Sequence, residues 1–160
     1  MADFSHLNQS GQATMVDITS KNPSARLARV LGSVHIPREK LDLFQAHVVQ
    51  EICSTARIAG IQAAKQTSSL IPMCHQVPLS SVSINIQLEQ ERGQFKIDCV
   101  CKTVGTTGVE MEAFVAAQLA ALTVYDMIKA VCPEAMIGPC HLAEKQGGKN
   151  GIWQHPTENE

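Results

Sequence analysis

Aromatic side chains and an excess of charge are what this chain has least of. Phe, Trp and Tyr make up 4% of its 160 residues, and 13 Lys and Arg against 15 Asp and Glu leave a formal net charge of -2. Nucleic-acid binding relies on a basic field around the phosphates and on aromatic platforms for the bases. The composition therefore argues against a nucleic-acid partner.

Long apolar runs and a secretory leader are also missing from the sequence. The uninterrupted apolar runs are far shorter than the roughly 20 residues of a membrane-spanning helix. The first eight residues have no basic segment followed by an apolar one, which a secretory signal requires. We therefore expect a cytoplasmic protein with no membrane partner.

The cysteines occur in no spacing typical of a metal site. There is no Cys-x-x-Cys pair, and no Cys/His spacing matches a zinc motif. Most lie among apolar residues, where free cysteine behaves as a small hydrophobic side chain. We therefore expect reduced cysteines and no resident metal. The six are Cys53, Cys74, Cys99, Cys101, Cys132 and Cys140.

Hydrophobic periodicity predicts interleaved strands and helices in one domain spanning residues 1–160. The predicted strands are 15–19, 26–36, 82–88, 95–101 and 136–143. The predicted helices are 37–48, 51–70 and one that follows Gly108, is capped by Thr106 or Thr107, and ends before Pro133. The hairpin of 82–88 with 95–101 favours an α+β sandwich, a mainly antiparallel sheet with helices packed on one face. Cys99 and Cys101 should both point into its core.

The last predicted helix carries charge at both ends. Glu110 and Glu112 lie in its first turn, where acids favour the helix dipole, and Asp126 and Lys129 share a face near its end. The simple interpretation of the second pair is an ion pair on a solvated face. Glu112 and Asp126 are 14 positions apart, which is roughly 21 Å of helix. Either one end is structural, or different chains bring opposite ends together at a subunit interface.

Two loops carry further candidate residues. His75 follows Cys74 in a segment between a helix and a strand, and taken alone this histidine is more often structural than a group that transfers protons. Lys145 and Lys149 flank two glycines, a composition that suits either a phosphate cradle or a mobile tail. Arg26, taken alone, is a surface charge on a strand.

Taken together and in order, these segments resemble the MoaC family of molybdenum cofactor biosynthesis, the cyclic pyranopterin monophosphate synthases. The resemblance runs from about residue 5 to 151, and its motifs are long. The matching runs are 15–17 (Met-Val-Asp), 55–65, 70–72 with 74–75, 107–113, 121–123 with 125–127 and 129–131, 137–139, and 145 with 147–149.

The resemblance implies a ferredoxin-like fold and a homohexamer, built as a trimer of dimers with interface active sites. It implies conversion of 3′,8-cyclo-7,8-dihydro-GTP to cyclic pyranopterin monophosphate with release of pyrophosphate. Asp126 and Lys129 match the catalytic aspartate and its neighbouring lysine. Substrate-binding positions are matched by Met73, Cys74, His75, Met111, Glu112, Arg26 and Lys145. No cofactor is implied, and a divalent cation accompanying the triphosphate is left open.

One position departs from the family pattern in its chemistry. Members usually carry Lys-Gly-Asp upstream of the 55–65 segment, and an ungapped alignment puts Val49, Gln50 and Glu51 there. Valine neither donates a proton nor neutralises phosphate. Gln76 also replaces a frequent proline. The alternative is therefore a non-catalytic or impaired relative that binds a nucleotide or pterin, or joins a hetero-oligomer.

Overall fold

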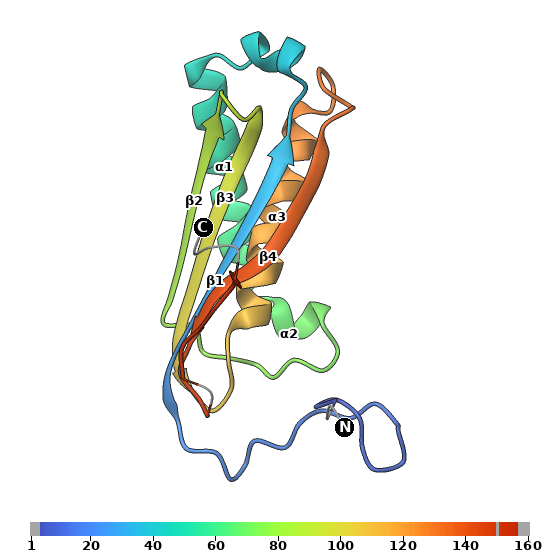
Figure 1. Ribbon diagram of the computed structural model, residues 1–160, viewed down its shortest axis with the longest axis vertical. Coiled ribbons are helices and arrows are strands. Elements are labelled where there is room, and N and C mark those ends of the chain that lie inside the picture. Colours follow the sequence, from blue (N-terminus) through green and yellow to red (C-terminus); the bar gives the residue numbers. More distant parts are fainter. Residues whose placement is uncertain (1–3, 150, 157–160) are drawn as a thin grey trace.

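The computed structural model describes residues 4–149 and 151–156, which build one antiparallel sheet and its helices (Figure 1). The strand order is β2-β3-β1-β4-β5. The strands are β1 (Ser24–His35), β2 (Ser81–Glu89), β3 (Gln94–Gly105), β4 (Met136–Gln146) and β5 (Trp153–Gln154). The helices are the 3-10 helix η1 (Arg38–Leu43), α1 (Ala46–Ala64), α2 (Thr67–Leu70) and α3 (Glu110–Ile128).

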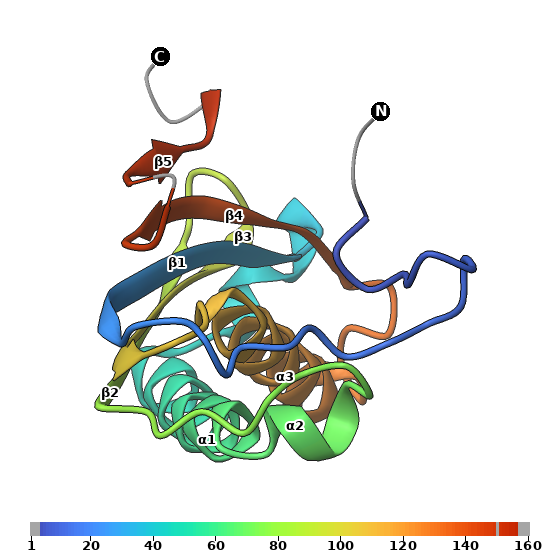
Figure 2. The same ribbon diagram turned by 90° about the horizontal axis from the view of Figure 1, so that it is seen from below.

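The connectivity is that of a ferredoxin-like fold. Strands and long helices follow one another as β1-α1-β2-β3-α3-β4, and each βαβ unit spans a strand from the other unit. Both α1 and α3 cover the same face of the sheet, as Figure 2 shows. The predicted α+β class is therefore confirmed, including the helices on a single face.

Small residues let the two long helices approach each other closely. Gly60 on α1 faces α3: a Cβ at this position would lie 2.8 Å from the Ala116 carbonyl oxygen and 3.3 Å from the Ala120 methyl group. The same atom would lie 2.6 Å from Cδ1 of Ile84 on β2. The helices and the sheet thus pack at a separation that only glycine permits here.

The helix α3 is the central core helix. Its mean hydropathy of 1.3 over an 18-residue window and its 19 residues give it the length and composition of a membrane span. It nevertheless packs against α1, β1, β3 and β4, and half of that window is buried inside the protein. Its apolar character therefore reflects burial in the domain.

The strands predicted at 26–36, 82–88, 95–101 and 136–143 are confirmed, with modest shifts at their ends. Cys99 and Cys101 are fully buried, as expected. The short strand predicted at 15–19 is wrong. Those residues are irregular because the Asp17 carboxylate accepts hydrogen bonds from the Thr19 amide at 2.9 Å and hydroxyl at 2.6 Å, which makes a turn.

The predicted helix boundaries need three corrections. Residues 37–48 form η1 and then a break, because α1 begins at Ala46 after the extended Gln45. The helix predicted at 51–70 is divided in two at residues 65–66. Neither Thr106 nor Thr107 caps α3, whose N-cap position is Val109 with no side-chain bond. The strand β5 was not predicted.

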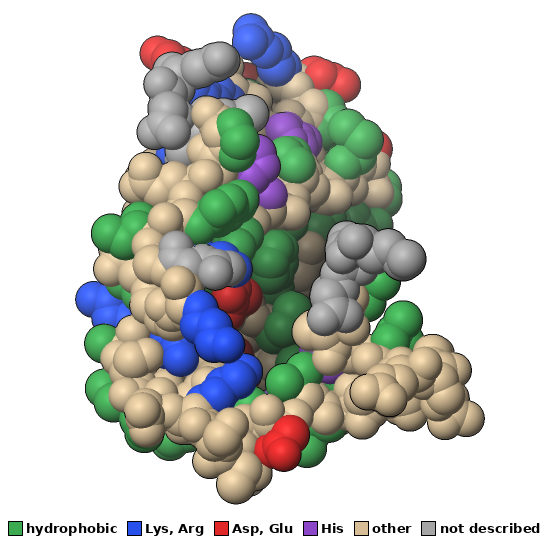
Figure 3. Space-filling model, turned by 60° about the horizontal axis from the view of Figure 1, so that its bottom comes forward, with side chains coloured by type: hydrophobic (Ala, Val, Ile, Leu, Met, Phe, Trp, Pro, Cys, Tyr) green, Lys and Arg blue, Asp and Glu red, His purple; other side chains and the backbone are tan. Residues whose placement is uncertain are grey.

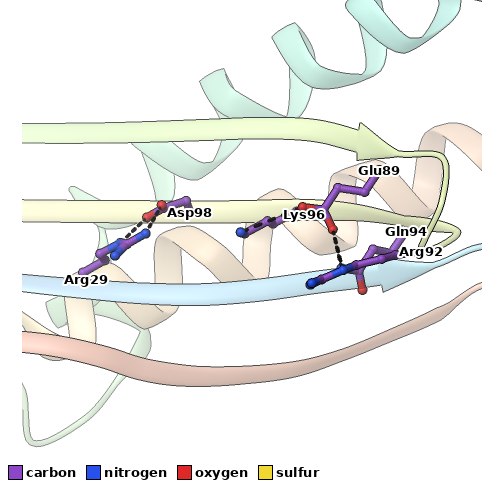
Figure 4. Close-up of polar contacts among 6 residues, drawn as sticks. All are labelled: Arg29, Glu89, Arg92, Gln94, Lys96 and Asp98. Carbon is purple, nitrogen blue, oxygen red and sulfur yellow. Dashed lines mark hydrogen bonds and ion pairs between the residues drawn. The ribbon is translucent and has the colours of Figure 1, made fainter. Parts of the chain in front are cut away.

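The face of the sheet opposite the helices is polar. Arg29 on β1 donates two hydrogen bonds to Asp98 on β3, at 2.9 and 2.6 Å (Figure 4). At the hairpin, Glu89 accepts a hydrogen bond from Gln94 at 2.8 Å and lies 3.9 Å from the Lys96 ammonium. These contacts link adjacent strands at half-exposed positions, where each pair adds up to about 1 kcal/mol.

Candidate functional site

The structure brings five of the predicted binding residues into one pocket. The loop after α2 and the first turn of α3 meet at the end of the molecule where β3 ends, which we call the pocket end (bottom of Figure 1). A cavity of about 330 Å³ lies between them. Its lining includes Met73, Cys74, His75, Met111 and Glu112, with Val77, Thr107, Gly108 and Glu110.

Glu112 is the most unusual group in this pocket. Its side chain is 4% exposed, and burial raises the pKa of its carboxyl, with a further contribution from the negative charge of Glu110. Burial also raises the pKa of the Cys74 thiol, helped by the charge of Glu112. Cys74 is therefore a neutral thiol and a poor nucleophile, whereas Glu112 is suited to holding or transferring a proton.

Basic side chains gather next to this pocket. A basin of about 720 Å³ is lined by Lys21, Arg26 and Lys149, together with Ser20, Asn22, Ser24, Thr106 and Gly148. A second cavity of about 130 Å³ adds Lys145 to Arg26 and Lys149. Figure 3 looks toward this end and shows Lys and Arg side chains beside acidic ones and a hollow with hydrophobic walls. Such a basin suits a polyphosphate.

The glycine loop at 147–148 is built around Arg26. Gly147 and Gly148 have φ values of +92° and +76°, in the region that favours glycine. A Cβ on Gly148 would lie 2.1 Å from Nη1 of Arg26, and one on Gly147 would lie 2.2 Å from the Ala25 carbonyl oxygen. Within the described part of the chain, Arg26 Nε is a buried donor without a hydrogen-bond partner. This close fit favours the phosphate cradle over the mobile tail for residues 145–149.

Sequence reasoning missed Lys21 and the segment around it. Lys21 lines both the pocket and the basin, so this residue lies where the two meet. Ser5, His6, Val16 and Ile18 from the same N-terminal segment form another wall of the pocket. The one available signal was the 15–17 motif, because nothing in the periodicity of this segment relates it to the loop at 71–75.

The predicted catalytic pair lies at the opposite end of α3. Lys129 Nζ donates to Asp126 Oδ1 at 2.6 Å, and the two side chains are 58% and 69% exposed. The hydrogen bond to Asp126 raises the pKa of Lys129, so this lysine is a cation at neutral pH. Since α3 runs the length of the domain (Figure 1), one chain does not bring this pair to Glu112.

Val49 lies in the second turn of α1, at the same end of the molecule as Asp126. It lines a groove of about 650 Å³ between α1 and β2, together with Phe44, Cys53 and Ile86. The basic residue lining this groove is Arg57, which donates to the Ile84 carbonyl at 3.2 Å. The groove around Val49 therefore holds a guanidinium already engaged with the backbone and no ammonium among its lining residues.

No three His, Cys, Asp or Glu side chains converge on a common metal position within residues 4–149 and 151–156. The MoaC family model matches residues 15–148. The chain belongs to the MoaC family. Membership gives it a role in molybdenum cofactor biosynthesis.

Proposed function

We propose that this MoaC-family protein is a cyclic pyranopterin monophosphate synthase acting on 3′,8-cyclo-7,8-dihydro-GTP. The supporting observation is the juxtaposition of two chemically different cavities. One holds His75 and the buried Glu112, and the adjoining one holds Arg26, Lys145 and Lys149. A nucleotide with a purine-derived ring and a triphosphate needs this combination.

In this proposal the basin holds the triphosphate and assists its departure as pyrophosphate. Arg26 and the lysines offset the negative charge that develops on the leaving oxygen. His75 and Glu112 orient the heterocycle, with Met73 and Met111 packing against it. A protonated Glu112, favoured by its raised pKa, donates a hydrogen bond to a ring nitrogen or carbonyl. The site residues need no cofactor for these tasks, and a cation brought with the triphosphate would join the phosphates in the basin.

Asp126 and Lys129 enter this site from another subunit. The distance along α3 keeps them from the pocket of their own chain, whereas both are exposed and available to a neighbour. We therefore infer a homohexamer, a trimer of dimers, in which each cytoplasmic active site combines the pocket end of one chain with the α3 terminus of another. Lys129, held protonated by Asp126, is then the general acid and Asp126 the acceptor.

The second candidate function is a MoaC-like protein that binds the nucleotide or a pterin, or hetero-oligomerises, without catalysis. Val49 is the observation that favours it, because its groove offers no ammonium in the position that the family lysine takes in sequence. We place the synthase first because the pocket, the basin and the Asp126–Lys129 pair are all present in the chain.

The deciding experiment supplies purified protein with the cyclic dihydro-GTP and measures cyclic pyranopterin monophosphate and pyrophosphate together. We expect both products in equal amounts, and a loss of about 10²–10⁴ in rate for Asp126→Ala. Tight substrate binding without either product would contradict the synthase and favour the binding protein. In that case Val49→Lys should restore product formation if the missing amine is the cause.

A further inference from the structure

Glu110 lies at the seam between the pocket and the cavity of about 130 Å³ that is lined by Lys145 and Lys149, which we call the small basic cavity. It is the first residue of α3, and it and Gly108 are the two residues that line both spaces. Its Oε1 atom lies 3.4 Å from Nζ of Lys145 on β4, and both side chains are about one-third exposed. An ion pair at this exposure adds about 1 kcal/mol or less to stability, so holding the fold together does not explain its position.

The carboxylate of Glu110 is folded back over Gly108. A Cβ on Gly108 would lie 1.8 Å from Oε2 of Glu110 and 2.7 Å from its carboxyl carbon. Any side chain at 108 would therefore push the carboxylate out of the seam. Glycine at this position keeps a negative charge at a defined place between two binding spaces.

The charge at the seam acts on both sides. On the side of the small basic cavity it holds the Lys145 ammonium beside Gly147 and Gly148, where a phosphate would bind. On the pocket side its own negative charge, beside the neutral carboxyl of the buried Glu112, makes the pocket less favourable for phosphate than for a neutral ring. Both effects favour one orientation of a nucleotide, with its phosphates beside Lys145 and its ring in the pocket.

We propose that Glu110 is a positioning residue that sets which way round the nucleotide binds, by keeping phosphate out of the heterocycle pocket and presenting Lys145 to the phosphate chain. This inference rests on the proposed synthase for its consequence in catalysis, although its electrostatic part does not. Removing the charge should make anions bind more tightly, and in the wrong place as well as the right one.

The test uses the intact protein, inorganic tripolyphosphate as ligand, and three variants. Glu110→Gln removes the charge, and Gly108→Ala displaces the carboxylate without removing it. Glu134→Gln is the matched control, since Glu134 is a half-exposed carboxylate 3.7 Å from the Lys40 ammonium at the other end of the protein. By calorimetry at low salt, we expect Glu110→Gln to bind tripolyphosphate about three- to tenfold more tightly. The control should match the wild type.

The place of binding is read by NMR. The amides of Gly147 and Gly148 report on the small basic cavity, and the methyl groups of Met73 and Met111 report on the pocket. In the wild type, tripolyphosphate should shift the amides alone; in Glu110→Gln and Gly108→Ala it should also shift the methyl groups. Equal methyl responses in wild type and Glu110→Gln, or unchanged or weaker anion binding in that variant, would overturn the proposal.

Kinetics separate this inference from the proposed function. With the cyclic dihydro-GTP, Glu110→Gln should lower kcat about tenfold or more while KM stays the same or falls, because misoriented substrate occupies the site. A purely structural defect would raise KM, and that result would count against the positioning role. If the wild type makes no product, the proposed function fails, and the tripolyphosphate measurements still decide whether Glu110 excludes phosphate from the pocket.

Discussion

Glu112 is an ionisable side chain whose burial costs stability once its carboxyl loses its proton, although the proposed site uses it. Its 4% exposed carboxyl is taken out of water at the start of a core helix, and the folded protein retains its proton at pH values where an unfolded chain has lost it. The sequence indicated an acid that suits a helix N-terminus, which is the usual position for a solvated one. Its burial depends on the loop at 71–75 and the N-terminal segment, which come from elsewhere in the chain.

The substitution Glu112→Gln tests this conflict. Since the folded-state pKa is raised, the stability of the wild type should fall as pH rises from the ordinary carboxyl value of 4.5 through the raised pKa. The neutral glutamine avoids that loss, so the variant should have the higher Tm at pH 7 and the same Tm as the wild type below pH 4.5. Its kcat/KM should fall about tenfold or more.

Scanning calorimetry across pH and the synthase assay measure the two effects. Glu91→Gln, an exposed carboxylate in the β2–β3 turn, is the control and should change neither property. A lower Tm at pH 7 for Glu112→Gln would show that the charged carboxylate stabilises the fold, and the interpretation given for its pKa would be wrong.

At the scale of single elements, the sequence predicted what periodicity can encode. Alternation located β2 and β3, small residues with helical spacing located α1, and a long apolar segment between Gly108 and Pro133 located α3. It failed where tertiary contacts override local preference: the Asp17–Thr19 turn replaces a strand, and Val109 rather than a threonine precedes α3. The pocket could be assembled from the family resemblance, whereas the position of Lys21 could not, because its segment has no regular structure.

Gly60 carries the element-scale prediction. Gly60→Ala should lower the free energy of unfolding by about 1–3 kcal/mol, because the new methyl group meets the rigid Ala116 carbonyl and forces α1 away from α3. This outweighs the roughly 1 kcal/mol that alanine gains over glycine in a helix. Urea denaturation measures the change. Gln62→Ala, an exposed position on the same helix, should alter stability by less than about 0.5 kcal/mol, and an equally stable Gly60→Ala protein would contradict the close packing.

At the scale of the whole molecule, our proposal makes a single chain half of a site. The pocket end provides Glu112 and the basin, and the far end provides Asp126 and Lys129. The core and the five-stranded sheet are built from residues of one chain. In the proposed assembly, activity would additionally require a second chain.

Mixing two impaired variants tests this arrangement. Glu112→Gln and Asp126→Asn chains, unfolded together and refolded at equal concentration, should form mixed assemblies that recover about a quarter of wild-type activity, since random pairing gives one site in four both intact partners. Each variant refolded alone is the control and should keep only its own residual activity, about a tenth of the wild type or less. Mixed assemblies, demonstrated by two affinity tags on one particle, that lack activity would place both residues in the same subunit's site.

The helix α3 has a further consequence for how this protein can change over time. Fourteen positions separate Glu112 from Asp126, close to four full turns at about 3.6 residues per turn, so the two carboxyl groups lie on nearly the same side of the helix. Inserting one residue between them would rotate one relative to the other by about 100° and lengthen the helix by about 1.5 Å. In an assembly with several equivalent sites, that error would be repeated in every one. We expect the amino acids along this helix to be exchangeable for others of similar size, and their number to be invariant.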